Sequence, residues 1–315
     1  MVVIHNMKNM ILSELYKNVT LKYLIVVFIS MFVVISAYSL LFESAPIEEW
    51  KENAQEMKEL QQEGILALSK ESGEENYDKL IDYFNGIVST IDYCLKNNIP
   101  YNPSNVYYFM SRTTNLFTIV IFLCIYLCSR VYSVESENET WKNLVCCGRN
   151  RNTIILGKMI FTIMLTCAVF LSYAFISFLV GLFRFGINGN DYIYVKMVEK
   201  SIVESNYIVD FFVSIGLSLY KTIFLIVLMT FIYFIFNNDK IALIVPISTF
   251  IFAGKINLLI EKYRWKKLLP FHYLTIDMKE VFIRSNMIYG FIIVLLLFMV
   301  IMSIGISLSF KHKEY

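Results

Sequence analysis

Long apolar runs alternate with short polar segments along the chain. No charged side chain occurs from Thr113 to Ser129 or from Met159 to Phe183. An α-helix of about 20 apolar residues crosses the ~30 Å hydrocarbon core of a bilayer at ~1.5 Å per residue, whereas a charged residue at the bilayer centre is costly. The two runs therefore predict membrane-spanning helices, and the polar segment between them is expected in water.

The same criterion, applied to the whole chain, predicts six spanning helices. They cover residues 23–42, 114–132, 158–182, 213–236, 241–260 and 285–310. The first run is 20 residues long, which exceeds the apolar region of a secretory signal peptide. The predicted fold class is an all-α integral membrane protein, whose main membrane domain covers residues 113–310.

Basic residues suggest an orientation for these helices. Those in and next to the polar segment 133–157 are Arg130, Lys142, Arg149, Arg151 and Lys158. Because cytoplasmic loops carry an excess of Lys and Arg, this segment is predicted to be cytoplasmic. With six spans, both termini are then cytoplasmic, including the tail 311–315. The segment 261–284 becomes external, although its six Lys and Arg residues argue for the opposite side.

Two further segments are predicted to be amphipathic. Residues 1–22 place apolar side chains at helical spacing among lysines, which is typical of an interfacial helix on the cytoplasmic face. Residues 43–112 hold 13 acidic and 6 basic residues, and Ser72-Gly73 separates two amphipathic stretches. We expect an external helical hairpin there that packs on itself or on the membrane surface. A substrate-sensing cap is the alternative.

Two residues interrupt the apolar pattern of the later spans. Lys221 is placed near the outer end of the span 213–236, where snorkelling of its long side chain is favoured over contact with a substrate in a transport path. Pro246 removes a backbone donor from the span 241–260 and permits a kink.

Composition and motifs exclude several classes of function. The chain is 57% hydrophobic and 17% charged, with a net charge of +2, which argues against a soluble domain and against nucleic-acid binding. It contains no G-x-x-x-x-G-K-[ST], H-E-x-x-H or G-x-S-x-G motif. Cys124 and Cys128 share a helix face, but packing is favoured over a metal pair because no histidine or carboxylate is near them in sequence. We predict no catalytic residue, no metal site and no cofactor bound by this chain.

The polar segment also carries a motif. Residues Glu135 to Lys158 read ESENETWKNLVCCGRNRNTIILGK. The pattern E-x-x-x-G-T-x-K-x-L-L-x-x-G-x-x-R-x-x-x-x-x-G-K is met by Glu135, Thr140, Lys142, Leu144, Gly148, Arg151, Gly157 and Lys158. This segment resembles the first cytoplasmic loop of type-2 ABC exporter permeases, especially the bacterial group that exports antimicrobial peptides or gives immunity to them. Glu139 stands where that family usually has glycine.

The resemblance implies a function and a partner. In this family the loop and an N-terminal elbow helix, here 1–22, dock on a separate ATPase subunit that binds ATP and Mg²⁺. The coupling residues implied are Glu135, Glu137, Glu139, Trp141, Lys142, Leu144, Gly148, Arg149 and Arg151. The chain is then expected to be the non-enzymatic permease subunit of an exporter in the bacterial plasma membrane. Its substrate would be a hydrophobic or amphipathic peptide, a lantibiotic-like antimicrobial or a drug, moved by alternating access.

The resemblance further implies a dimer with a second copy or a homologous permease, surrounded by membrane lipids. The first and fifth spans lie nearest the two-fold axis in this family, so Pro246 and Ser248 are expected to face the partner or the transport path. Together with Lys221 they are the candidate path or interface residues. An immunity or sensor protein that works without an ATPase and binds a peptide through residues 43–112 is the alternative.

Overall fold

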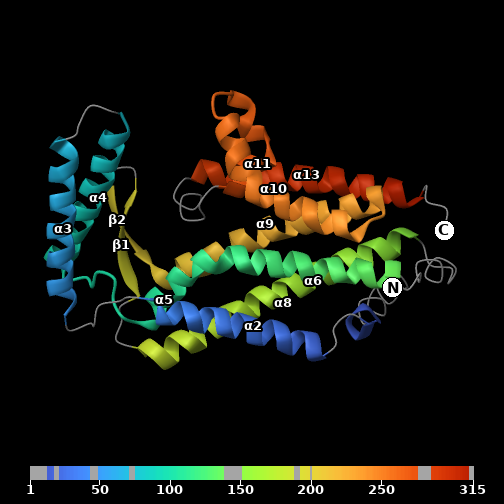
Figure 1. Ribbon diagram of the computed structural model, residues 1–315, viewed down its shortest axis with the longest axis horizontal. Helices are drawn as coiled ribbons and strands as arrows, with labels where there is room; N and C mark the ends of the chain where they lie inside the picture. Colours follow the sequence, from blue (N-terminus) through green and yellow to red (C-terminus); the bar gives the residue numbers. More distant parts are fainter. Residues whose placement is uncertain are drawn as a thin grey trace. The chain divides into compact units, whose positions relative to one another are not determined.

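The computed structural model describes residues 13–17, 21–42, 49–70, 75–137, 151–187, 192–198, 201–275 and 285–311 (Figure 1). The chain divides into two compact units. The first comprises Met1–Ser30, Asn115–Tyr173 and Ser214–Tyr315, and the second comprises Met31–Thr114 and Ala174–Val213. Each unit is described separately below.

Five helical stretches of the described chain are long and apolar enough to cross a membrane. They are Val106–Val134, Asn152–Phe185, Tyr207–Phe236, Asp239–Leu259 and Ile288–Ser309. The helices that contain them are α5 (Val106–Thr113), η1 (Thr114–Leu116) and α6 (Phe117–Glu137) for the first, then α8 (Arg151–Phe185), α9 (Tyr207–Phe236), α10 (Asp239–Leu259) and α13 (Ser285–Lys311). The first predicted span, 23–42, corresponds to α2 (Leu21–Leu40), which contains a shorter apolar stretch, Ile25–Leu40. A multi-pass helical protein is therefore confirmed, whereas the count of six spans is not.

Asparagine side chains fix where two of these helices begin. Asn105 is fully buried, and its side chain accepts a hydrogen bond from the Tyr108 amide at 2.8 Å, so the first spanning stretch starts eight residues before the predicted boundary. Asn238 caps α10 in the same way by accepting from the amides of Lys240 and Ile241. Asn237 adopts a φ of 51°, which reverses the chain between α9 and α10.

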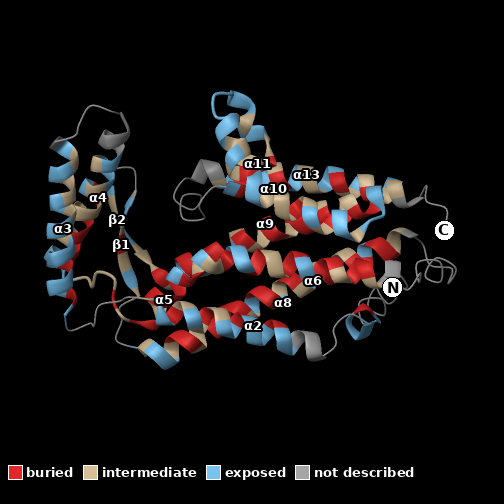
Figure 2. Ribbon diagram, in the orientation of Figure 1, coloured by how far each residue is buried: buried red, intermediate tan, exposed pale blue. Residues whose placement is uncertain are grey.

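The spanning helices differ in how much of their surface the chain itself covers (Figure 2). Within an apolar window of 18 residues in each stretch, half of the residues are buried in the first two stretches and 56% in α9. The share falls to 17% in α10 and 22% in α13. Gly305 permits a close contact between α13 and α9, because a Cβ there would lie 2.6 Å from the Phe231 ring of α9. The apolar faces of α10 and α13 that remain uncovered require lipid or another protein.

The segment after α10 folds back within the first unit. Residues Arg264–Leu268 form the 3₁₀-helix η2, and Pro270–Thr275 form α11, which packs against α10 and α13 (Figure 1). Tyr273 and Leu274 are buried, and the Tyr273 hydroxyl donates to the Lys267 carbonyl at 2.8 Å. Short helices thus occupy the described part of the segment predicted at 261–284.

The second unit contains the helices α3 (Trp50–Lys70) and α4 (Glu75–Asn97), which lie side by side within the range 43–112 (Figure 1). Their shared core consists of Trp50, Ala54 and Ile91, with Ile87, Leu95 and Tyr101 packed around it. The remaining apolar side chains of α3 are more exposed, with Leu60 at 56% and Leu66 at 62%. Whether these helices lie outside the cell stays a prediction.

A two-stranded antiparallel sheet is the exception to the all-α prediction. Strands β1 (Ile193–Val198) and β2 (Ser201–Asn206) pair in register from Ile193↔Asn206 to Val198↔Ser201, and β1 packs against α4. The alternation in the sequence IYVKMV is a strand signal, but the run is only six residues long. The sequence predicts only a connection here, between the spans 158–182 and 213–236.

Candidate functional site

The two ends of the predicted coupling loop are defined by helices. Glu135 and Glu137 belong to the last turn of α6, and Arg151 is the first residue of α8. Six of the coupling residues implied by the resemblance lie outside the described residues: Glu139, Trp141, Lys142, Leu144, Gly148 and Arg149. The helix predicted within the loop also lies outside them, so those assignments stay predictions.

The last residue of the loop motif, Lys158, has a fully buried side chain in α8. Its Nζ donates a hydrogen bond to Oε1 of Glu14 at 3.1 Å, and the exposed fractions of the two side chains are 0% and 3%. Nζ also lies 3.5 Å from the Val131 carbonyl oxygen of α6. Burying a lysine is costly without a compensating carboxylate, so this contact joins the short helical segment 13–17 to α8.

Aromatic and hydroxyl groups extend this contact to α6 and α9. The Lys158 Nζ lies 5.8 Å from the ring centroid of Tyr132, a distance at which a cation is attracted to the ring. Thr230 Oγ1 lies 3.2 Å from the Tyr132 hydroxyl oxygen. We call Glu14, Tyr132, Lys158 and Thr230 the Lys158 cluster. It joins the N-terminal segment, α6, α8 and α9 within one unit.

The arrangement of the Lys158 cluster can transmit a displacement. Lys158 stands seven residues after the first residue of α8, so a movement of the loop end would be passed to Lys158 through the helix backbone. From Lys158 the movement would reach Glu14, which is 144 residues away in sequence. Sequence reasoning included Lys158 in the motif but missed its partner. The available signal was that Glu14 is the only acidic residue among the first 42.

The candidate path or interface residues lie in different surroundings. Pro246 is buried and Ser248 is half-buried, both inside α10. Lys221 is only 4% exposed, and its Nζ donates to the Leu274 carbonyl of α11 at 3.1 Å. The snorkelling interpretation of Lys221 is therefore wrong, because the ammonium group binds a buried carbonyl. Its role in a transport path stays a prediction.

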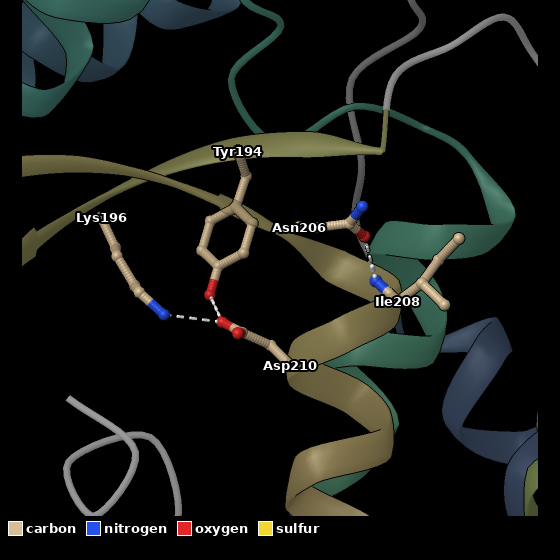
Figure 3. Close-up of polar contacts among 5 residues, drawn as sticks. All are labelled: Tyr194, Lys196, Asn206, Ile208 and Asp210. Carbon is tan, nitrogen blue, oxygen red and sulfur yellow. Dashed lines mark hydrogen bonds and ion pairs between the residues drawn. The ribbon is translucent and has the colours of Figure 1, made fainter. Parts of the chain in front are cut away.

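The second unit holds a partly buried ion pair, shown in Figure 3. Asp210 lies in the first turn of α9, and its Oδ2 accepts a hydrogen bond from Lys196 Nζ at 2.8 Å and another from the Tyr194 hydroxyl. Burial raises the pKa of Tyr194, and the hydrogen bond to Asp210 raises it further. Asn206 accepts from the Ile208 amide at 2.9 Å. These contacts fasten β1 and β2 to the start of α9.

A metal ion in the described part of the chain would need a group of side chains that could bind it. No group of three or more His, Cys, Asp or Glu side chains is arranged there to hold a metal ion. Cys128 Sγ lies 3.6 Å from Thr166 Oγ1 and 3.7 Å from the Thr162 carbonyl oxygen. This cysteine therefore packs α6 against α8.

The comparison with known families agrees with the helix arrangement. A family model described as ABC-2 family transporter protein matches residues 84–237, from within α4 to the turn after α9. No curated protein and no solved structure matches the chain. The matched range includes the whole loop between α6 and α8, together with three members of the Lys158 cluster. Residues 84–237 are thus similar to the ABC-2 transporter family, and this match supports an ABC-2 type permease.

Proposed function

We propose that this protein is the permease subunit of an ATP-driven exporter and that the Lys158 cluster passes the movement of a bound ATPase to the spanning helices. The family match supports a membrane permease component that works with an ABC ATPase subunit. The observation that carries the coupling role is the buried Lys158–Glu14 ion pair at the end of the loop motif. The chain contains no phosphate-binding loop motif, so ATP and Mg²⁺ are bound by the partner.

In the proposed mechanism the ATPase docks in the cytoplasm on the loop between α6 and α8. ATP-driven closure displaces this loop, and α8 moves as a lever, since its 35 residues extend over about 50 Å. The Lys158 cluster then carries the N-terminal segment, α6 and α9 with it. This concerted movement switches a cavity between inward-open and outward-open states.

The low coverage of α10 supports a second permease copy beside it. Ile244, Ile251 and Phe252 are each more than half exposed, and Pro246 and Ser248 belong to the same helix. Small residues and uncovered apolar faces are typical of helix contacts in membranes. Part of this surface faces the partner copy or the transport path, and lipid covers the rest.

The proposed substrate is hydrophobic or amphipathic: a peptide, a lantibiotic-like antimicrobial or a drug. Its support is the aromatic-rich, charge-poor character of the spanning helices. An immunity or sensor protein that needs no ATPase is less favoured, because the matched family consists of transporter components.

Docking on the loop is tested by a double substitution, Trp141→Ala with Lys142→Glu. The permease is co-produced with its ATPase and purified through a tag on the permease. We expect normal amounts of permease in the membrane, with less ATPase retained and less permease-stimulated ATP hydrolysis. The matched control is Lys51→Glu, which makes the same charge change on α3. Unchanged retention and unchanged hydrolysis would remove the loop from the proposal.

A further inference from the structure

A strongly basic and aromatic turn follows α10. We call residues 262–268, with the sequence KYRWKKL, the basic turn. It contains four Lys and Arg residues and no acidic residue. Its apolar side chains are also exposed, with Tyr263 at 54%, Trp265 at 49% and Leu268 at 67%. Leu258 and Leu259, at the end of α10 just before it, are 71% and 80% exposed.

The protein holds the backbone of the basic turn in place. The amides of Tyr263, Lys266 and Leu269 donate to carbonyls three residues earlier, at 3.0 to 3.2 Å. The buried Tyr273 of α11 donates its hydroxyl hydrogen to the Lys267 carbonyl. The rings of Tyr263 and Trp265 lie 5.5 Å apart. The side chains are therefore presented from an ordered turn that packs on α11.

The surroundings of the basic turn are electropositive. Within the part of the chain that the structure describes, the ion pairs involve other residues, and none includes Lys262, Arg264, Lys266 or Lys267. The pKa of His272 in α11 responds to burial and to the positive charges of this turn. Burial lowers the pKa of His272, and the positive charges of Lys266 and Lys267 lower it further.

These features fit one partner. We propose that the basic turn binds the headgroups of anionic phospholipids at the membrane interface. The turn directly follows a spanning helix, where Trp and Tyr prefer the boundary between headgroups and hydrocarbon. Exposed leucines enter the apolar layer beside it, and each Lys or Arg near an anionic surface strengthens the binding. This role also accounts for the many basic residues in a segment that the proposed topology places outside, because they pair with headgroups of the adjacent leaflet.

Tryptophan quenching tests the proposal directly. Trp50→Phe and Trp141→Phe leave Trp265 as the only tryptophan. This protein is reconstituted into vesicles that contain equal mole fractions of either brominated phosphatidylglycerol or brominated phosphatidylcholine. We expect the anionic lipid to quench Trp265 with about threefold or greater preference, because three or four cationic side chains enrich it locally. Equal quenching by the two lipids, or quenching by neither, overturns the proposal.

A charge variant with a matched control separates local binding from the net charge. Arg264→Gln, Lys266→Gln and Lys267→Gln together should abolish the preference. Lys51→Gln, Lys96→Gln and Lys240→Gln remove the same charge from exposed positions elsewhere and should preserve it. A preference that both triple variants lose equally would contradict a local site.

A second measurement does not depend on replacing the buried Trp50. The full-length protein is titrated with phosphatidylglycerol and with phosphatidylcholine, and the bound lipids are counted by native mass spectrometry. We expect fewer phosphatidylglycerol adducts only in the triple variant of the basic turn. The same adducts in both triple variants would overturn the proposal. Binding of the ATPase should be unchanged, so failure here is distinct from failure of the proposed coupling.

Discussion

Two ion pairs in the described part of the chain differ in burial, because Lys158–Glu14 is fully buried and Lys196–Asp210 is only partly buried. Lys158 and Glu14 are 0% and 3% exposed and lie 144 residues apart in sequence, whereas Lys196 and Asp210 are 16% and 9% exposed and lie 14 residues apart. The shorter contact, at 2.8 Å against 3.1 Å, belongs to the more exposed pair. The distance between nitrogen and oxygen therefore does not rank the two pairs by their effect on stability. The cost of leaving one charge unpaired increases with the burial of that charge.

The order of the elements along the chain explains the difference between the two ion pairs. A hairpin and the helix that directly follows it are neighbours by connectivity, so the Lys196–Asp210 pair strengthens a contact that the backbone already favours. The N-terminal segment and α8 have no such connection. The Lys158–Glu14 pair is a long-range link, and under the proposed coupling its loss affects how separate elements move together as well as how stable they are.

The largest predicted effect comes from removing one partner of the fully buried pair. Lys158→Met leaves the Glu14 carboxylate without its ammonium partner and should lower the free energy of unfolding by about 3–5 kcal/mol. Thermal unfolding in detergent measures the loss. Lys158→Met with Glu14→Leu should recover most of it, because a matched apolar pair leaves no buried charge. Equal stability of the single variant and the parent would contradict the assigned burial.

A smaller effect is expected at the second pair. Asp210→Asn removes the charge but keeps a hydrogen-bond acceptor for Lys196 and Tyr194, so the loss should be about 1–3 kcal/mol. The same unfolding assay ranks it against Lys158→Met. A larger loss than for Lys158→Met would reverse the comparison.

The Tyr194 hydroxyl that donates to Asp210 should make stability depend on alkaline pH. The pKa of Tyr194 is raised in the folded protein, so its contribution to stability is present below the ordinary tyrosine pKa of about 10 and is lost as the pH rises through the folded-state value. Tyr194→Phe removes the titrating group and should therefore reduce the alkaline loss. Stability measured at pH 8 and pH 11 in the parent and in Tyr194→Phe checks this, and an equal loss in both proteins would contradict it.

The smallest effect tests how far the Lys158 cluster extends. Thr230→Val keeps the shape of the side chain but removes the hydroxyl near Tyr132, at a cost of about 0.5–1.5 kcal/mol. Thr222→Val, at another buried threonine of α9 that bonds its own helix, is the matched control. If Thr230→Val changes permease-stimulated ATP hydrolysis no more than Thr222→Val does, the cluster ends at Tyr132.

Hydrophobic patterning predicted the helices better than their ends. Charge-free runs are long enough to mark the spans, because bilayer thickness sets their length. Two helices extend beyond those runs: α5 begins at the cap formed by the buried Asn105, and α8 begins at Arg151, seven residues before the predicted start at 158. The start of α5 depends on a single side-chain hydrogen bond, which periodicity does not reveal.

The site was predictable only in part. The motif drew attention to the loop and to Lys158, but the partner Glu14 comes from a segment whose contact with α8 follows from three-dimensional packing. The hydrogen-bond partner of Lys221 was also not predictable from the sequence. The position of Lys221 near the outer end of its span suggested snorkelling, whereas the fold places the Leu274 carbonyl of α11 within hydrogen-bond distance.

The central claim is that the Lys158–Glu14 pair couples the ATPase to the spanning helices, and a charge exchange tests it most directly. Permease-dependent ATP hydrolysis is measured for the purified complex with Lys158→Glu, with Glu14→Lys and with both. We predict that each single variant retains the bound ATPase but loses most of the stimulation, and that the double variant regains it. Exchanging Lys196 and Asp210 in the same way should leave hydrolysis near the parent value. Full stimulation in the single variants, or no recovery in a double variant that folds and binds the ATPase, would contradict the account.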